Sequence, residues 1–441
     1  MKKVKKWVHF IAICGTGMGG MAVVMKKMGW KVTGSDIDIY PPISSYLSNN
    51  KINIQNAFKL SHVKKDIDLI VLGGSALIDD RNNPEYIRAK ELGLRIVGYG
   101  QLAAKYIVKN NSIVVTGTYG KTTITSMLAW VMSDLGEDVS YLIGGQPVNF
   151  NEIAHVGSSE YSIVEGDEYP SIIYFDFKPR FMYYKPKFVI LTSAKWDHLD
   201  VFPEEKNYVE RYISLVKLIP KDGVLVASKD GENLDAVLRY AKCKVIRYSE
   251  KDFKDSLSVI GRHNIENAAA VLKLLNELGF PEDKIYKSLA GFRGVKKRLE
   301  VVYADSKTTL ISDFAQHRDK LKASIDSVDD RYQKEKFIVV LDPHASIFKK
   351  TEALEKFSEV FKKVDYLIVR RLKTLKGHHD VTGPMIVKAT GLPKNRAEYI
   401  PLDVDIIGKL MEQTRGQKSV ILFCSSGGWN GLIEKTIKAL S

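Results

Sequence analysis

The sequence predicts a three-domain α/β protein built on parallel sheets, and three observations support this prediction. The chain has 441 residues, more than one ordinary domain of about 100 to 200 residues holds. Short apolar, strand-like runs alternate with helical patterns along the whole chain, which is typical of parallel sheets. A new strand pattern also begins twice, after a polar break near residues 109–112 and after a glycine- and lysine-rich turn at 291–302. We therefore expect domains at 1–108, 109–293 and 294–441.

The first domain is predicted to contain a doubly wound, Rossmann-like sheet. An apolar strand pattern leads into a glycine turn, a helical pattern continues through Lys27, and a second strand pattern follows at 30–36. Two more strand patterns, DIDLIVLGG at 66–74 and LRIVGY at 94–99, flank a predicted helix at 83–93. This order of elements is typical of a nucleotide-binding domain.

The middle and last domains repeat this alternation. In the middle domain a strand, a tight loop and a helix are predicted at 113–136, and a helix is predicted at 261–280. Strand-like runs that end in polar residues lie between them, at 161–169, 186–198 and 223–228. The last domain has predicted strands at 336–343, 365–370 and 419–428 and predicted helices at 351–364 and 432–440. Each domain is therefore expected to hold its own sheet.

Composition and charge restrict the partners of the protein. The formal charge of +14 favours anionic ligands, but the lysines are scattered and no clusters of alternating aromatic and basic residues are present, so we expect phosphate contacts and no nucleic acid.

The opening run MKKVKKWVHFIAICG imitates a signal peptide, but His9 interrupts the apolar run, and Ile13 before Cys14 is too bulky for lipoprotein cleavage. Three widely spaced cysteines indicate no disulfide framework. We expect a cytoplasmic monomer with no membrane partner.

The first glycine loop predicts a diphosphate site. Gly15, Gly17 and Gly20 form the G-x-G-x-x-G pattern between a strand and a helix, and Asp36 ends the next strand. The glycines allow close backbone approach, and the amino end of the helix offers free amides to an anion. The pattern does not choose among a nicotinamide or flavin cofactor, another nucleotide diphosphate and a structural turn.

A second glycine loop predicts binding of a nucleoside triphosphate, although it is two residues shorter than the usual G-x-x-x-x-G-K-[ST] pattern. It consists of Gly117, two intervening residues, Gly120, Lys121 and Thr122. Lys121 is expected to neutralise the β and γ phosphates, Thr122 to bind magnesium, and the loop amides to cradle phosphate oxygens. A structural turn with an exposed lysine is the alternative.

Acidic residues at strand ends predict the metal ligands that phosphoryl transfer requires. Glu165 follows an apolar strand pattern and is expected to face magnesium, with Asp167 and Glu168 behind it, unless this segment is a solvated acidic turn. Asp197 and His198 end another strand pattern, where His198 is a candidate ligand for a second metal and otherwise a structural residue.

These motifs together resemble the ATP-dependent Mur ligases of cell-wall peptidoglycan synthesis. The short loop Thr116–Thr123 matches the family pattern T-G-T-x-G-K-T-[ST]. Four further stretches are similar to family motifs in the same order, namely VEGDE, WDHLD, GRHNIENAAA and GVKKRLEVV. The resemblance covers nearly the whole chain and implies an N-terminal Rossmann-like domain, a central P-loop ATPase domain and a C-terminal Rossmann-like domain that takes the amine.

The resemblance also implies roles for individual residues, with ATP and Mg²⁺ as the cofactors. Glu165 and His198 would hold magnesium with Thr122, and Arg298 would reach the ATP phosphates from the last domain. The remaining ATP-binding residues would be Gly117, Thr118, Gly120, Lys121 and Thr123 around the phosphates and Asn264 and Asn267 beside the adenine. The uridine diphosphate would lie at Gly15, Gly17, Gly20 and Asp36.

Two branches of the family are candidates for the substrate. The segments CGTGMGG, GSDIDIYPPIS and SSGGWNG resemble the branch that joins UDP-N-acetylmuramate to the tripeptide L-alanyl-γ-D-glutamyl-meso-diaminopimelate. The branch that adds L-alanine is the alternative. The Tyr40-Pro41-Pro42 segment favours the peptide branch.

The last domain departs from the family pattern where the amine is expected to bind. Relatives have D-D-[FY]-[AG]-H-H-P, and this chain retains Asp313 and His317 as catalytic candidates. Three residues differ from the pattern: Ser312, Gln316 and Arg318. Pro343 is followed by His344 where the peptide branch typically has arginine. These departures leave the nucleotide chemistry intact and leave the amine substrate open.

The implied reaction is attack of the UDP-N-acetylmuramate carboxylate on ATP, which gives an acyl phosphate, followed by attack of the amine. Asp197 or His317 is a candidate to accept the proton of the amine, and either is otherwise structural. An NAD-dependent dehydrogenase would explain the first glycine loop alone, and a P-loop nucleic-acid-binding protein would use the charge of +14. The dehydrogenase leaves the second loop and Glu165 unexplained, and the sequence lacks the interleaved aromatic and basic clusters expected of a nucleic-acid binder.

Overall fold

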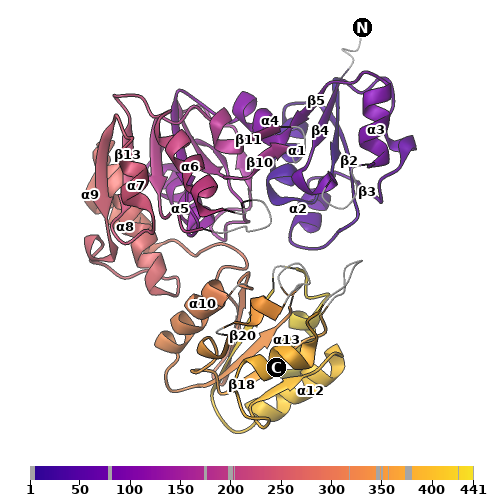
Figure 1. Cartoon of the computed structure of the whole chain (residues 1–441), viewed down its shortest axis with the longest axis vertical. Coiled ribbons are helices and arrows are strands. Elements are labelled where there is room, and N and C mark those ends of the chain that lie inside the picture. Colours follow the sequence, from indigo (N-terminus) through magenta and orange to yellow (C-terminus); the bar gives the residue numbers. More distant parts are fainter. Residues whose placement is uncertain are drawn as a thin grey trace. The chain divides into compact units, whose positions relative to one another are not determined.

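The computed structural model (Figure 1) describes residues 5–77, 82–172, 176–196, 202, 204–316, 318–343, 348, 351–355, 357–372, 380–425 and 427–440. The chain divides into two compact units. One unit comprises Met1–Ser258 with His263–Gly294, and the other comprises Val259–Arg262 with Val295–Ser441. The first unit holds two large sheets and the second unit holds one.

The first sheet has five parallel strands in the order β3-β2-β1-β4-β5. All residues of β1 and β4 are buried, as expected for parallel strands covered by helices on both faces. The elements are β1 (Trp7–Ile11), α1 (Thr16–Lys27), β2 (Lys31–Asp36), α2 (Ile43–Asn49), β3 (Ile54–Asn56), η1 (Leu60–His62), β4 (Leu69–Leu72), η2 (Gly74–Leu77), α3 (Pro84–Glu91), β5 (Ile96–Gly98) and α4 (Tyr99–Tyr106).

The second sheet has seven strands in the order β14-β13-β12-β6-β9-β7-β8, parallel except for the β7–β8 pair. A two-stranded antiparallel ribbon, β10-β11, follows β9. The elements are β6 (Asn111–Thr116), α5 (Lys121–Asp134), β7 (Ser140–Leu142), β8 (Ala154–His155), β9 (Tyr161–Gly166), β10 (Pro170–Ile172), β11 (Asp176–Pro179), η3 (Arg180–Tyr183), β12 (Phe188–Leu191), α6 (Glu205–Val216), β13 (Val224–Ser228), α7 (Leu234–Leu238), β14 (Lys244–Tyr248), η4 (Glu250–Asp252), α8 (Arg262–Glu277) and α9 (Glu282–Ala290).

The third sheet has six strands in the order β15-β16-β20-β17-β18-β19, and its edge pair β15–β16 is antiparallel. The elements are β15 (Glu300–Ala304), β16 (Thr308–Asp313), α10 (Arg318–Arg331), β17 (Lys336–Leu341), η5 (Thr351–Leu354), η6 (Phe357–Glu359), β18 (Tyr366–Val369), α11 (Gly383–Ala389), β19 (Ala397–Tyr399), α12 (Asp403–Thr414), β20 (Ser419–Cys424) and α13 (Leu432–Leu440). All residues of β16 and β20 are buried, so this sheet carries the core of its unit.

The helix predicted over 351–364 is wrong. The segment instead forms the two short 3₁₀ turns η5 and η6. Backbone amides there bond to the carbonyl three residues earlier, as from Val364 N to Phe361 O at 3.1 Å. The apolar residues of the segment have helical spacing, but consecutive tight turns also direct side chains three residues apart to one side and bury them in the core.

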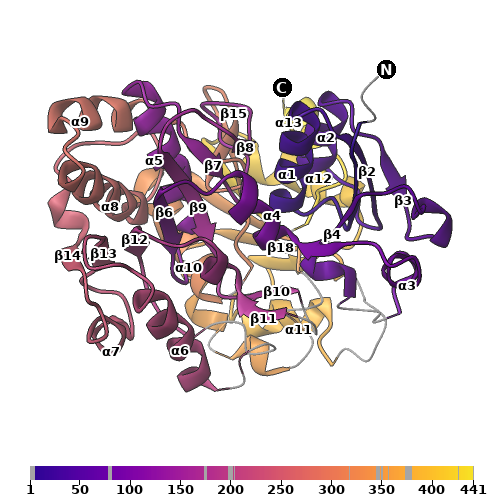
Figure 2. The same ribbon diagram turned by 90° about the horizontal axis from the view of Figure 1, so that it is seen from above.

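The first two sheets of the larger unit pack against each other through α1 (Figure 2). A Cβ atom on Gly20 would lie 3.1 Å from Ile153, 3.2 Å from Ala154 and 3.3 Å from Leu142, which lie in or beside β7 and β8. The third glycine of the first loop therefore permits close packing between α1 and the middle sheet.

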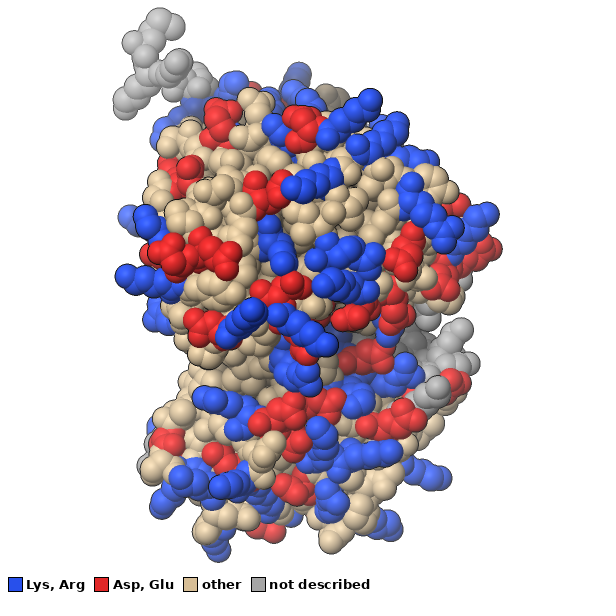
Figure 3. All heavy atoms as spheres, turned by 90° about the vertical axis from the view of Figure 1, so that its left-hand side faces the viewer, with Lys and Arg blue, Asp and Glu red and all other residues tan. Residues whose placement is uncertain are grey.

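The surface charge is mixed. Figure 3 shows lysine and arginine interspersed with aspartate and glutamate on the face that it presents. Among the described residues many charges form surface pairs, such as Lys244 with Glu277 and Arg88 with Glu91. On the face in Figure 3 the positive side chains are spread over the surface among negative ones.

A buried carboxylate ties together the elements of the first domain. Glu85 at the start of α3 is fully buried and accepts hydrogen bonds from Ser35 Oγ, from the backbone N of Lys59 at 3.2 Å and from His62 Nδ1 at 2.6 Å. His9 Nε2 lies 3.2 Å from the same carboxylate. Burial by itself raises the pKa of Glu85, but the hydrogen bonds from His9 and Ser35 outweigh it, and the pKa lies below its ordinary value.

We expect the substitution Glu85→Gln to destabilise the protein in a pH-dependent way. A carboxylate whose folded-state pKa is lowered stabilises the fold above its ordinary pKa of 4.5, and this contribution is lost as the pH falls through the folded-state value. Glu85→Gln should lower the free energy of unfolding by about 1–3 kcal/mol at pH 7, and the difference from the unaltered protein should shrink in acid. Urea unfolding at pH 7 and pH 4 measures both.

Glu91→Gln is the matched control, because Glu91 lies on the same helix but pairs with Arg88 at the surface. It should cost at most about 0.5 kcal/mol. Equal losses in the two variants would contradict the role of the buried carboxylate.

Candidate active site

The second glycine loop joins β6 to α5, and both of its glycines are required by the backbone. Gly117 has φ 120° and Gly120 has φ 74°, in the region that side chains rarely adopt. A Cβ atom on Gly117 would lie 2.2 Å from Thr192 Oγ1, and one on Gly120 would lie 2.5 Å from Asn267 Oδ1. The short loop therefore lies directly against its neighbours and leads into the amino end of a helix, which favours anions.

Lys121 is held inside this loop by two acceptors. Its Nζ atom donates to the carbonyl oxygen of Gly117 at 2.7 Å and to Glu168 Oε2 at 3.2 Å. Burial by itself lowers the pKa of Lys121, but the carboxylates of Glu168 and Asp167 outweigh burial and the pKa is raised. Lys121 is therefore a cation, and Glu168 is its ion-pair partner.

Glu165 lies beside Thr122 because β9 pairs with β6 in parallel. The register places Glu165 opposite Val115, at the carboxyl end of both strands. Glu165 Oε2 accepts a hydrogen bond from Thr122 Oγ1 at 3.2 Å, and Oε1 accepts one from the backbone N of Gly144. The structure thus brings two predicted site residues into contact, and both offer oxygen atoms.

The predicted adenine residues also reach this loop. Asn267 Nδ2 donates to Asn264 Oδ1 at 3.1 Å, both side chains are buried on α8, and the Asn267 side chain lies against Gly120. Thr118 is buried as well and donates through Oγ1 to the carbonyl oxygen of Lys195 at 2.8 Å. One cluster therefore contains most of the ATP-binding residues predicted for the larger unit.

Sequence reasoning missed a link between the two glycine loops. Arg180 Nη1 donates to Asp167 Oδ2 and lies 3.3 Å from Tyr99 Oη, and its guanidinium stacks 4.6 Å from the Tyr99 ring centre. A Cβ atom on Gly17 would lie 3.0 Å from the same ring. Burial raises the pKa of Tyr99 to about 12, so its hydroxyl stays protonated at neutral pH. No motif marks Arg180, and the partners of this partly buried arginine come from segments far apart in the chain.

Hydrogen bonds to Asp36 hold the backbone of the first glycine loop. Gly15 precedes α1, and Asp36 Oδ2 accepts a hydrogen bond from the backbone N of Cys14 at 2.7 Å. Asp36 Oδ1 accepts from the backbone N of Ile37 at 2.8 Å and of Asp38 at 3.1 Å. Asp36 is thus largely occupied in holding the loop at the carboxyl ends of β1 and β2.

In the smaller unit Asp313 is committed to backbone and side-chain donors. Its two oxygens accept from the backbone N of Leu299 and Ala315, each at 2.8 Å, and from Ser324 Oγ at 2.9 Å. The guanidinium of Arg298 lies 4.7 Å from the ring centre of Phe314. Asp313 therefore fixes the turn that carries Arg298, which is a structural task.

A cluster of acidic and basic residues in the smaller unit is built around Arg370, which no sequence motif marks. Arg370 is buried and donates to both oxygens of Asp403, each at 2.8 Å, and to Asp342 Oδ1 at 3.2 Å. Ser425 Oγ donates to Asp342 Oδ2 at 2.8 Å, and Gln316 Nε2 donates to the carbonyl oxygen of Asp342 at 3.1 Å. This cluster lies at the carboxyl ends of β17, β18 and β20.

Several predicted residues lie outside the described part of the chain: Asp197, His198, His317 and His344. Of the departures from the family pattern, Ser312 is buried in β16 and Arg318 pairs with Asp319 at 3.0 Å on the surface. Thr123 follows Thr122 in the first turn of α5.

Within the described residues no three histidine, cysteine, aspartate or glutamate side chains form a ready-made metal cluster. No helix among the described residues is long and apolar enough to cross a membrane.

Comparison with known proteins identifies the family. The model of the Mur ligase family, catalytic domain, matches residues 7–109, that of the Mur ligase middle domain matches 115–275, and that of the Mur ligase, glutamate ligase domain matches 297–427. UDP-N-acetylmuramate–L-alanine ligase of Pelagibacter ubique is 30% identical over 397 residues, with 82% of each chain covered. The chain belongs to the Mur ligase family.

Two further relatives represent different amine substrates. The UDP-N-acetylmuramate–L-alanyl-γ-D-glutamyl-meso-2,6-diaminoheptandioate ligase of Haemophilus influenzae is 29% identical over 370 residues, covering 78% of this chain and 81% of the relative. The crystal structure of UDP-N-acetylmuramate-alanine ligase from Thermotoga maritima has a TM-score of 0.79, 22% identity and 98% coverage of both chains.

Family membership confirms the predicted three-domain α/β architecture and establishes the protein as an ATP-dependent ligase that forms an amide bond. It thereby decides against the dehydrogenase and the nucleic-acid-binding alternatives. The relatives carry the names of both peptide and L-alanine ligases, so membership leaves the amine open.

We expect Asp313→Ala to act on stability. It removes the acceptor of three hydrogen bonds in a buried setting, and should lower the free energy of unfolding of the smaller unit by about 2–3 kcal/mol. Chemical unfolding followed by far-ultraviolet circular dichroism measures the loss. Asp319→Ala, at the exposed pair with Arg318, should stay within about 0.5 kcal/mol of the unaltered protein. An Asp313→Ala protein of unchanged stability would contradict this role.

Proposed function

We propose that this Mur ligase joins the carboxylate of UDP-N-acetylmuramate to the amine of L-alanyl-γ-D-glutamyl-meso-diaminopimelate, with ATP as the energy source and an acyl phosphate as the intermediate. The observation that carries the nucleotide half of the proposal is the partly buried Lys121 in the short loop, next to the pair formed by Glu165 and Thr122. The peptide as amine is supported by the Haemophilus influenzae relative and by the segments that resemble the peptide branch. L-Alanine is the alternative, supported by the Pelagibacter ubique relative.

Lys121 would hold the β and γ phosphates of ATP in place of its present partners, Glu168 and the Gly117 carbonyl, and the amides of residues 117–122 would hold phosphate oxygens. Asn264 and Asn267 would lie beside the adenine, and the Asn267 side chain lies against Gly120 of the loop. Glu168 would keep a donor, since the hydroxyl of Tyr208 lies 3.3 Å away and donates to it.

The oxygen atoms at this site fit magnesium. A carboxylate and a hydroxyl are hard ligands, and Glu165 Oε2 lies 3.2 Å from Thr122 Oγ1. Neighbouring ligands of an octahedral ion with bonds of about 2.1 Å lie roughly 3.0 Å apart, so these two atoms are near the right spacing. Thr122 and Glu165 would hold Mg²⁺, with His198 as a further ligand. The ion would neutralise charge on the phosphates as the carboxylate approaches.

The uridine diphosphate is expected at the first glycine loop. Gly15 and Gly17 lie at the amino end of α1, where free amides and the helix dipole favour a pyrophosphate. Gly17 contacts Tyr99, and Tyr99 contacts Arg180, which holds Asp167 of the acidic segment. Arg180 thereby positions the acidic segment relative to the sugar-nucleotide loop.

The smaller unit supplies the remaining residues of the proposal. Arg298 would stabilise the phosphates during transfer, and Asp313 holds its turn in place. His317, with Asp197 of the larger unit as the alternative, would accept the proton that the ammonium nucleophile loses.

The amine is tested by phosphate release from ATP and Mg²⁺ at fixed UDP-N-acetylmuramate. We expect stimulation by L-alanyl-γ-D-glutamyl-meso-diaminopimelate and little by L-alanine or by the lysine-containing tripeptide. Stimulation by L-alanine alone would move the protein to the alternative branch. Lys121→Ala should lower kcat by about 10²–10³-fold, because it removes the cation proposed to hold the phosphates. Lys221→Ala, at an exposed site of the same domain, is the matched control and should leave kcat unchanged.

Magnesium binding is tested by titration of the ion. Glu165→Gln should raise the Mg²⁺ concentration for half-maximal activity by about tenfold or more, because it replaces an anionic ligand by a neutral amide. Glu160→Gln lies just before the same strand, at an exposed residue, and should leave the titration unchanged. An unaltered titration in Glu165→Gln would mean that this carboxylate does not hold the ion.

A further inference from the structure

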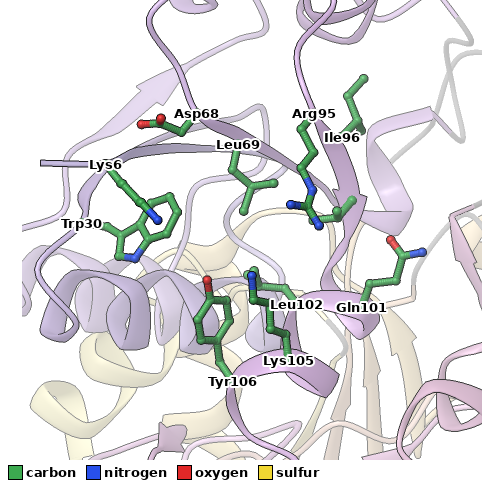
Figure 4. A pocket seen from close by; sticks show the side chains of 11 residues that line it. Lys6, Trp30, Asp68, Leu69, Arg95, Ile96, Gln101, Leu102, Lys105 and Tyr106 are labelled. Atoms are coloured by element: carbon green, nitrogen blue, oxygen red, sulfur yellow. The ribbon is translucent and has the colours of Figure 1, made fainter.

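The first domain has a pocket, here called the hollow, at the edge of the sheet opposite the first glycine loop (Figure 4). It has a volume of about 550 Å³, within the range of small-molecule sites. Lys6 precedes β1, Asp68 precedes β4 and Arg95 precedes β5, so the hollow lies at the amino ends of parallel strands. The glycine loop follows the carboxyl end of β1, roughly 16 Å away along a five-residue strand. The hollow is therefore separate from the proposed uridine diphosphate site.

The charges around the hollow favour an anion. Three cations, Lys6, Arg95 and Lys105, line it together with one carboxylate, Asp68. Asp68 is already engaged, since its Oδ2 atom accepts the backbone N of Trp7 at 2.6 Å. Within the described part of the chain the guanidinium of Arg95 has no hydrogen bond or ion pair. Figure 4 shows Arg95 and Lys105 approaching the same space from opposite sides.

The apolar lining favours a flat ring. Trp30 and Tyr106 are partly exposed in the hollow, and Leu69 and Leu102 are buried beneath it. Lys6 Nζ lies over the Trp30 ring, 5.6 Å from its centre, and Lys105 Nζ lies over the Tyr106 ring, 5.3 Å from its centre. Aromatic rings stack well on a nucleobase, and cations next to such rings contact its phosphate.

We propose that this hollow binds a nucleoside monophosphate, or the same moiety of a larger nucleotide, with the base against Trp30 and Tyr106 and the phosphate between Arg95 and Lys105. Two rings and two converging cations match the two halves of such a ligand. A plain anion would use the cations alone, and an apolar ligand would leave Arg95 without a partner.

Photolabelling of the full chain with 8-azidoadenosine 5′-monophosphate tests the proposal, because peptide mapping separates the hollow from the ATP loop. We expect saturable labelling of peptides that contain Trp30 or Tyr106, suppressed by AMP and not by inorganic phosphate at the same concentration. Arg95→Gln should reduce this labelling by about tenfold through loss of a charge-assisted contact. Because Arg95 is exposed, the variant should fold normally.

Arg88→Gln is the matched control, since it removes the same charge from α3, outside the hollow, and should leave labelling unchanged. Three results would overturn the proposal. One is labelling confined to peptides of the ATP loop and α8, another is equal labelling in the two arginine variants, and the third is suppression by phosphate as complete as by AMP. Ligase activity of the same Arg95→Gln protein is measured separately and should be retained.

Discussion

The partly buried charge of Lys121 is the constraint on which the rest of the larger unit depends. An ammonium group at the base of a loop costs free energy unless a carboxylate accompanies it, and Glu168 supplies that carboxylate. The acidic segment that carries Glu168 must then lie next to the loop, which the parallel pairing of β9 with β6 achieves. Glu165 lies three residues earlier on the same segment, and the pairing of β9 with β6 also brings it within hydrogen-bond distance of Thr122.

The acidic segment itself requires a counter-charge. Asp167 faces Arg180, and Arg180 is in turn held by the hydroxyl and the ring of Tyr99. Tyr99 is the first residue of α4, and it lies beneath the glycine loop of the first sheet. Each charge thus determines the position of the next group, and the contacts run from the loop that carries Lys121 to the first glycine loop. The acidic segment, Arg180 and Tyr99 form the connection between the two loops.

Local sequence patterns predict those features of the site that depend on residues close together in the chain. The two loops, the helix at 83–93 and the strand end at Glu165 follow from glycine spacing, apolar periodicity and the short reach of a strand–loop–helix unit. Family resemblance predicts Asn264 and Asn267 beside the adenine, and the structure brings Asn267 against Gly120 of the loop. No local sequence pattern marks either residue. Arg180, Tyr99 and Arg370 were missed because their importance comes from tertiary contacts between segments far apart in the chain. The turns at 351–364 were missed because their apolar spacing also fits a helix.

The close approach of α1 to the middle sheet at Gly20 limits where the chain can be divided into separately folding fragments. Ile153, Ala154 and Leu142 are buried, and Gly20 is among their neighbours. A fragment that ends before β6 would carry the exposed flank of α1, and the remaining piece would expose the apolar partners of that helix to water. The first two sheets should therefore be produced as one polypeptide. The boundary near residue 294 is the better place to divide the chain, since the contacts of the protein separate into two compact units there, with Val259–Arg262 as the one earlier segment that belongs to the smaller unit.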